Sequence, residues 1–110
     1  MSPAFKVYIS RTAESDIENA YLWWSEHRSS VQANKWYGSI LDSIKTLSSM
    51  PERCPLADEA TDLGAQVRQL LFGIGGGRPT HRILFQVRDK TVHILRVNHT
   101  AQGGVSGPNE

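Results

Sequence analysis

Three short apolar runs occupy the C-terminal part of the chain, between Val67 and His99. A glycine-rich stretch at residues 73–79 separates the first run from the second, and Asp89 and Lys90 separate the second from the third. Short apolar runs bounded by turn-forming residues indicate antiparallel strands joined by hairpins. The pattern therefore predicts a three-stranded antiparallel meander.

The turn between the last two runs fixes their expected register. A two-residue turn at Asp89 and Lys90 pairs Val87 with Val92, Phe85 with Ile94, and Ile83 with Arg96. Because side chains alternate along a strand, one face collects Ile83, Phe85, Val87, Val92 and Ile94. The opposite face receives Arg82, Leu84, Gln86, Arg88, His93, Leu95, Val97 and His99. We therefore predict one core face and one mixed, basic face.

The N-terminal half of the chain predicts a strand followed by a helix. Residues 5–9 alternate in the manner of a strand, which we place at the edge of the sheet. Apolar residues then recur at helical spacing, at Ala13, Ile17, Ala20, Tyr21 and Trp24. Thr12 is the expected N-cap of this helix, which should end near His27. Trp23 lies off the apolar stripe, so it is either simply exposed or part of an interface.

A second helix is expected from about Val31 to Ser49, with Ser30 as its N-cap and Pro51 as its stop. Its apolar stripe comprises Ala33, Trp36, Tyr37, Ile40, Ile44 and Leu47. Two amphipathic helices joined by a very short link form an antiparallel hairpin. The apolar stripes of the hairpin and the apolar face of the sheet can then bury each other.

The predicted fold class is therefore α+β: an N-terminal strand, a helical hairpin, and a three-stranded antiparallel meander with the helices on one face of the sheet. Residues 1–100 should form a single domain. Residues 51–64 read as an irregular connection with one helical turn around residues 58–63. Residues 101–110 show no hydrophobic pattern, so we expect a disordered tail.

The cysteine content and the hydropathy of the chain predict the cellular compartment of the protein. The chain of 110 residues contains one cysteine, Cys54, which excludes an internal disulfide and favours a reducing compartment. We expect this cysteine to act as a small hydrophobic residue. No apolar run approaches the roughly 20 residues of a membrane span, and no signal-peptide pattern is present at the N-terminus. A cytoplasmic protein without membrane contact is expected.

Charge is distributed unevenly along the chain. Residues 1–67 carry six Lys or Arg and nine Asp or Glu, whereas residues 68–110 carry six and two. The predicted strands are therefore basic, through Arg68, Arg82, Arg88 and Arg96 together with His93 and His99. Such a surface fits an anionic partner, either nucleic acid or an acidic protein segment, but it also fits an ordinary solvated face.

The same basic residues allow two kinds of function. Arginines could hold a phosphodiester while His99 acts as general acid or base, or the arginines could only bind acidic side chains. The run of Gly75, Gly76 and Gly77 leads into a strand rather than a helix, so a phosphate-binding loop is not expected. No spacing fits a metal site or a nucleophile elbow. We expect no cofactor.

The sequence motifs of the last predicted strands, and of the loop before them, resemble those of a known family. PERCPLADEA, VRQLLFG and HRILFQVRDKTVHILRVNH, in this order, are similar to the RelE/ParE superfamily of type II toxin–antitoxin toxins, and closer to its ParE, or plasmid-stabilisation, branch. The matching positions are Arg68, Leu70, Gly73, Arg82, Ile83, Leu84, Phe85, Val92, Ile94, Leu95, Val97 and His99. His81 replaces the usual aromatic residue, and Asn98 replaces a usual basic one. No tyrosine follows Tyr37, although ribonuclease members often carry one near the C-terminus.

The resemblance implies a growth-inhibiting toxin that poisons DNA gyrase and is neutralised by a cognate antitoxin. Target or antitoxin contacts would then involve Arg68, Arg82, Arg88, Arg96, His99 and Trp23. One alternative is a RelE-type endoribonuclease that cuts mRNA on the ribosome, with Arg68, Arg82, Arg96 and His99 at its catalytic site. Another alternative is an inactive binding module. Whether the protein is an enzyme stays open at this stage, although the missing tyrosine favours a non-enzyme.

Overall fold

The computed structural model describes residues 4–57, 66–73 and 78–100. Its elements follow the order β1 (Lys6–Ile9), α1 (Arg11–His27), α2 (Ser30–Lys45), the 3-10 turns η1 (Thr46–Ser48) and η2 (Pro51–Arg53), β2 (Arg68–Phe72), β3 (His81–Arg88) and β4 (Thr91–His99). This is the α+β fold that the sequence predicts. The helical turn expected at residues 58–63, the three glycines at 75–77 and the tail at 101–110 lie outside the described residues.

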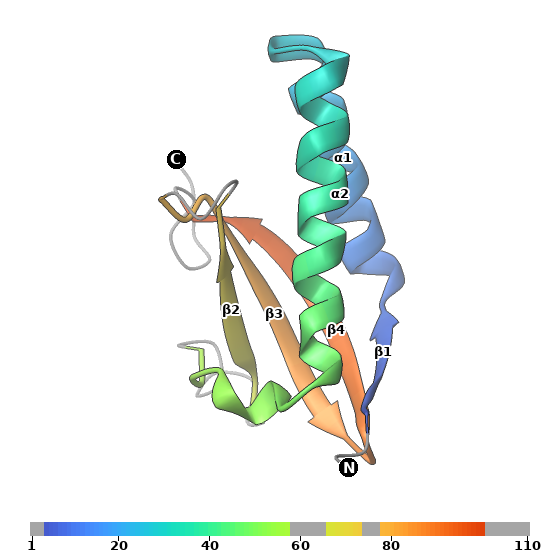
Figure 1. Cartoon of the computed structure of the whole chain (residues 1–110), viewed down its shortest axis with the longest axis vertical. Helices are drawn as coiled ribbons and strands as arrows, with labels where there is room; N and C mark the ends of the chain where they lie inside the picture. Colours follow the sequence, from blue (N-terminus) through green and yellow to red (C-terminus); the bar gives the residue numbers. More distant parts are fainter. Residues whose placement is uncertain (1–3, 58–65, 74–77, 101–110) are drawn as a thin grey trace.

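The four strands form one sheet in the order β1-β4-β3-β2, shown in Figure 1. The pairs β2–β3 and β3–β4 are antiparallel, as the meander predicts. β1 lies at the edge, as expected, but it runs parallel to β4 and makes the sheet mixed. A parallel neighbour requires a long connection across the sheet, and the chain between β1 and β4 includes the helical hairpin and two further strands.

The hairpin between β3 and β4 turns through Asp89 and Lys90, as predicted. Both residues have positive φ angles, 51° and 64°, which is the backbone of a two-residue type I′ turn. The pairs Val87–Val92 and Phe85–Ile94 are also confirmed. The turn therefore sets the register near the hairpin end.

The register changes further along the same pair of strands. A β-bulge between Leu84 and Phe85 makes Ile83 pair with Val97, so the predicted Ile83–Arg96 pair is wrong. A bulge inserts one extra residue in one strand and thereby exchanges the faces beyond it. Val97 is consequently buried in the core, and its predicted place on the basic face is wrong. His99 moves with it and pairs with His81.

The helices begin one or two residues earlier than the sequence predicts. Ser10, not Thr12, caps α1, because its hydroxyl accepts a hydrogen bond from the Ala13 amide at 3.1 Å. The same hydroxyl donates to the Leu95 carbonyl at 3.3 Å, so this cap also ties the helix to β4. Ser29 likewise replaces Ser30 as the cap of α2.

The second helix is shorter than expected. It ends at Lys45, not at Ser49, and the 3-10 turn η1 follows directly. Met50 adopts a left-handed conformation with a φ of 45° just before Pro51. The chain therefore leaves the helical path before the proline, since a residue that precedes proline is disfavoured in the α-helical region.

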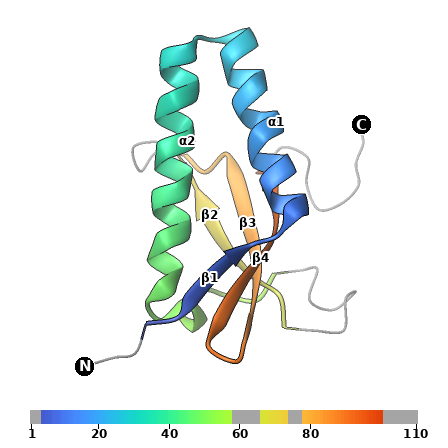
Figure 2. The ribbon, with the colours of Figure 1, turned by 90° about the vertical axis from the view of Figure 1, so that its right-hand side faces the viewer.

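The two helices lie side by side as one layer over one face of the sheet (Figure 2). Between the layers, the main core contains Ala13, Ile17, Trp36, Ile40, Ile44, Leu47, Cys54, Phe72, Ile83, Phe85, Val92, Ile94 and Val97. Cys54 thus acts as a buried hydrophobic residue, as predicted. A second, smaller apolar cluster contains Ala57, Val67 and Leu84, and Leu95 packs against it. None of the described helices has the length and apolar character needed to cross a membrane.

Candidate functional site

A cleft of about 660 Å³ lies between α1 and the adjoining ends of β3 and β4. We call it the α1–β4 cleft. It is lined by Asp16, Asn19, Ala20, Trp23, Trp24 and Arg28 from the first helix and its end, and by Thr80, His81, Arg96, Val97, Asn98 and His99 from the sheet side. The cleft therefore combines aromatic rings, arginines and histidines.

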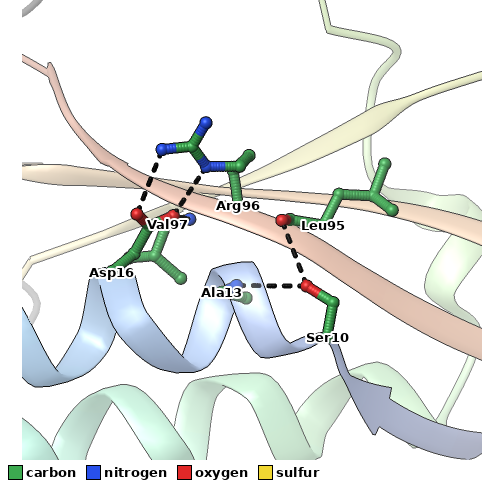
Figure 3. A network of polar contacts seen from close by, with 6 residues as sticks. All are labelled: Ser10, Ala13, Asp16, Leu95, Arg96 and Val97. Atoms are coloured by element: carbon green, nitrogen blue, oxygen red, sulfur yellow. Dashed lines mark hydrogen bonds and ion pairs between the residues drawn. The ribbon is translucent and has the colours of Figure 1, made fainter.

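Asp16 and Arg96 form a two-pronged ion pair at the wall of this cleft (Figure 3). Arg96 donates from Nε to Oδ2 at 2.8 Å and from Nη2 to Oδ1 at 3.1 Å. The Val97 amide also donates to Oδ2, at 2.9 Å. The hydrogen bond to Asp16 raises the pKa of Arg96, and 51% of the arginine side chain stays exposed. Asp16 therefore holds a charged arginine in one orientation while leaving part of it open to a partner.

The pair joins residues 80 positions apart in the chain, which explains why sequence reasoning did not find Asp16. In the sequence, Asp16 reads only as a negative charge near the start of a helix, where it interacts favourably with the helix dipole. In the sequence, Arg96 reads only as one of several basic residues on the predicted strands. Its pairing with Asp16 becomes evident only when the bulge and the packing of α1 on β4 are known.

Two histidines face each other across β3 and β4 at the same cleft. The ring centres of His81 and His99 lie 5.0 Å apart, and the His81 ring also lies 5.2 Å from that of Trp36. His81 is buried, and its Nδ1 forms a hydrogen bond with the Thr80 hydroxyl at 2.9 Å. Burial, with a contribution from His99, lowers the pKa of His81 from 6.5 to about 4. His81 is therefore neutral at physiological pH.

An aromatic wall closes the cleft on the helix side. Trp23 is 46% exposed and stacks on His27, with ring centres 4.6 Å apart and planes 12° apart. It also meets the edge of Trp24 at 5.6 Å. Arg28 follows at the C-terminal end of α1. Tryptophan and arginine are among the residue types that are enriched at binding hot spots.

The structure brings together only part of the predicted residue set. Trp23, Arg96 and His99 line the α1–β4 cleft. Arg88 is exposed at the other end of β3, next to the hairpin turn.

The remaining two arginines contribute to the fold. Arg68 pairs with Phe85, four positions from His81 along β3, which corresponds to about 13 Å. Its Nη1 donates to the carbonyls of Cys54 at 2.6 Å and Glu52 at 3.3 Å. Arg82 donates from Nη1 to the Gln69 side chain on the neighbouring strand at 3.0 Å. Neither arginine is among the residues that line the cleft.

A second hollow lies on the other flank of α1, between the two helices. This α1–α2 groove of about 510 Å³ is lined by Ile9, Glu14, Ile17, Glu18, Tyr21, Asn34, Tyr37 and Leu41. The rings of Tyr21 and Tyr37 meet edge to face at 5.7 Å, and the Tyr21 hydroxyl donates to the Asn34 side chain at 2.9 Å. Its charged residues are acidic, in contrast to the arginines of the α1–β4 cleft.

The lowered pKa of His81 predicts a specific loss of stability in acid. The unfolded chain takes up a proton near pH 6.5, whereas the folded chain resists protonation down to about pH 4. The free energy of unfolding should thus fall between these two pH values and level off below them. We expect a loss of about 1–2 kcal/mol, less than the full pKa shift implies, because water in the cleft screens the charge.

Urea unfolding of the wild type and of His81→Phe, measured from pH 7.5 to pH 4, would test this expectation. Phenylalanine keeps a ring against Trp36 but cannot take up a proton. The difference in unfolding free energy between the two proteins should therefore shift in favour of the variant as the pH falls. An unchanged difference over this range would contradict the lowered pKa.

Comparisons with known proteins agree with this fold. Residues 7–103 match a family model described as the ParE toxin of the type II toxin-antitoxin system parDE. A structure of the chromosomal ParDE toxin–antitoxin system from P. aeruginosa superposes with a TM-score of 0.71 at 20% identity, covering 89% of this chain and 98% of that one. The toxin–antitoxin complex RelBE2 from Mycobacterium tuberculosis gives a TM-score of 0.57 at 23% identity, covering 90% and 94%. A search of curated protein sequences gave no significant match.

Proposed function

The chain belongs to the ParE toxin family of type II toxin–antitoxin systems, and on this basis we propose that it inhibits growth by poisoning DNA gyrase and is neutralised by a cognate antitoxin. The proposed setting is the cytoplasm, where gyrase and its DNA substrate are found. The α1–β4 cleft is the proposed contact surface for the target, because it combines Trp23, Arg28 and the oriented Arg96.

The position of the arginines is the observation that favours binding over bond cleavage. A ribonuclease needs a general acid, a general base and charge stabilisation within reach of one phosphate. Of the four residues suggested for such a site, Arg96 and His99 line the cleft, whereas Arg68 and Arg82 do not line it and hydrogen-bond within the fold. In addition, Asp16 offsets the charge of Arg96.

A plasmid assay tests the proposal directly. Purified protein is added to DNA gyrase, ATP and relaxed plasmid, and the products are resolved after protease and detergent treatment. A gyrase poison should cause linear plasmid to accumulate in a gyrase-dependent manner. Unchanged supercoiling without any linear product, at protein concentrations well above that of gyrase, would refute the proposed target.

One observation favours a second candidate, the ribosome-dependent endoribonuclease. His81 lies beside His99 in the cleft, so two imidazoles are present where the sequence offered only one clear proton-transfer group. Against this candidate, His81 is buried. Cleavage of mRNA on translating ribosomes by the purified protein, with no effect on gyrase, would select this second function.

We expect the antitoxin to bind in both hollows. Because the charges of the two hollows differ, we expect a different kind of segment in each. An acidic segment of the antitoxin suits the α1–β4 cleft, where Arg28 and Arg96 are located. Over the α1–α2 groove the segment must be apolar or basic, since Glu14 and Glu18 line that surface. An amphipathic helix in a groove of this kind places apolar residues at positions i, i+3, i+4 and i+7.

Replacing Tyr37 with alanine should weaken antitoxin binding at least tenfold. Tyr37 is 43% exposed and forms one wall of the α1–α2 groove together with Tyr21. Its loss removes a large ring from the proposed contact, and such aromatic residues carry much of the binding energy at interfaces. Titration calorimetry with the cognate antitoxin gives the affinity.

Met50→Ala is the matched control for this prediction. Met50 is a large apolar residue that is 68% exposed, but it does not line the groove. Equal affinities for the wild type and both variants would show that the antitoxin does not use the α1–α2 groove.

A further inference from the structure

We propose that the face of the sheet turned away from the helices binds a short stretch of single-stranded nucleic acid, near the turn between β3 and β4. The surface, called here the outer-face patch, consists of Lys6 and Tyr8 on β1, His93 on β4 and Arg88 on β3. None of these residues lines the α1–β4 cleft or the α1–α2 groove. The proposal is independent of the proposed toxin function.

The alternation of side chains along the strands places the patch on the uncovered face. β1 lies beside β4 at the edge of the sheet (Figure 1). The neighbours of the patch residues along their strands lie in or pack against the main core between the sheet and the helices; they are Val7, Ile9, Val87, Val92 and Ile94. Because successive side chains point to opposite faces, the four patch residues project away from the helices.

Tyr8 and His93 form an aromatic pair in the patch. They are directly paired across β1 and β4, and their ring centres lie 6.0 Å apart with planes inclined by 64°. Tyr8 is 58% exposed, more than Trp23 or Tyr37. An exposed ring on a sheet offers its face to an unpaired base, and such stacking works with any base. The pair therefore provides a stacking platform.

Two exposed basic side chains lie beside the aromatic pair. Lys6 and Arg88 pair with the same residue, Thr91, from opposite sides of β4. Strand geometry places the Cα atom of Lys6 roughly 7 Å from that of Tyr8, and the Cα atom of Arg88 roughly 8 Å from that of His93. Long, flexible side chains at these distances can reach the phosphates next to a base that stacks on Tyr8.

The charge of the strands supports an anionic occupant. The four described strands contain no Asp or Glu, and Lys6 and Arg88 are among their five Lys and Arg residues. Asp89 in the adjoining turn is followed by Lys90, so the turn adds no net charge. An acidic protein segment would complement this charge equally well but has no need of an exposed aromatic pair. A duplex keeps its bases stacked inside, so the pair favours a single strand.

Fluorescence anisotropy of labelled oligothymidylate, titrated with the full-length chain at several salt concentrations, tests the patch. Tyr8→Ala should weaken binding about fivefold or more, because it removes the stacking face. Single strands lose affinity with salt at a log–log slope of about −0.7 per contacted phosphate, so two contacts predict a slope of about −1.4. Lys6→Ala or Arg88→Ala should each weaken binding and bring the slope to about −0.7.

Tyr37→Ala and Lys35→Ala are the matched controls, because they remove the same residue types from exposed positions on α2. Both should bind the oligonucleotide as the wild type does. All the substituted positions are exposed, so the variants should fold, and thermal unfolding followed by circular dichroism checks this. Oligouridylate should bind about as well as oligothymidylate, since the proposed contacts involve bases and phosphates rather than the sugar.

Several results would overturn the proposal. The wild type could show no saturable binding, or binding confined to one of the two oligonucleotides. A folded Tyr8→Ala protein could bind as tightly as the wild type, or Arg96→Ala could lose binding instead, which would assign the nucleic acid to the α1–β4 cleft. Displacement of the oligonucleotide by an equal charge concentration of polyglutamate would identify the patch as a contact for an acidic protein segment.

Discussion

Phe85→Ala is expected to lower the free energy of unfolding by about 3–5 kcal/mol. Phe85 is fully buried in the middle of β3 and pairs with Ile94 on β4. It belongs to the main core between the sheet and the helices. Truncation removes most of a large apolar side chain and leaves a cavity that rigid neighbouring strands cannot close, so the cost lies well above that of an average substitution.

Urea unfolding followed by tryptophan fluorescence and circular dichroism measures this loss. Ile44→Ala, on the facing helix and 2% exposed, should cost about 2–5 kcal/mol for the same reason. Leu71→Ala is the control, since Leu71 is 50% exposed on β2, and surface substitutions usually change stability by less than about 0.5 kcal/mol. Losses below about 0.5 kcal/mol at both core positions would invalidate the assignment of the core face.

Periodicity was sufficient to predict most of the fold, because the helices and hairpin depend on local signals. The stripe of Ala13, Ile17, Ala20 and Trp24 defines which face of α1 meets the sheet, and Ala13 and Ile17 are buried there. The turn at Asp89 and Lys90 likewise needs only its two residues and the flanking strands. By contrast, the parallel pairing of β1 with β4 depends on where the helical hairpin places the chain, and no local pattern contains that information.

The bulge was missed although the sequence contains a signal for it. The buried residues of β4 are Val92, Ile94 and Val97, so their spacing changes from two to three. With strict alternation, the side chain of Val97 would lie on the other face of the sheet from that of Ile94. One extra residue between them places both side chains in the core. Capping by Ser10 instead of Thr12 has a different cause, because the long-range bond from Ser10 to the Leu95 carbonyl decides between two similar hydroxyls.

The candidate site was predictable only at the level of its strand residues. Arg96 and His99 follow from the basic residues of the predicted strands, and Trp23 follows from its place off the apolar stripe. Asp16 could not be identified as the partner of Arg96, because the pair joins the first helix to the last strand. His81 appeared only as a departure from the usual aromatic residue, and its neighbour His99 became evident once the register beyond the bulge was known.

The first helix separates two surfaces of opposite character. Asp16, Ala20 and Trp23 line the α1–β4 cleft, whereas Ile17, Glu18 and Tyr21 line the α1–α2 groove. Substitutions on one flank of α1 can therefore change one surface while sparing the other. Variants in the α1–α2 groove can therefore test antitoxin binding while leaving the α1–β4 cleft, the proposed target contact, unchanged.

We expect Arg96→Ala to reduce growth inhibition strongly and His99→Ala to leave it largely intact. If the cleft serves recognition, the loss of an oriented, half-exposed arginine removes a charge-assisted contact, whereas the loss of His99 removes no step that gyrase poisoning requires. Colony formation after induction, at matched protein levels, measures the effect.

Arg88→Ala provides the matched control, because it removes the same charge from an exposed residue that lies outside the cleft. Arg96→Ala also leaves Asp16 with one hydrogen bond fewer at each carboxylate oxygen, so thermal unfolding of each purified variant must show that it is folded. Retained toxicity in a folded Arg96→Ala protein would remove the cleft as the target contact. Complete loss of toxicity in His99→Ala, together with ribosome-dependent mRNA cleavage by the wild type, would instead identify an endoribonuclease, because a general acid or base is indispensable to cleavage but not to binding.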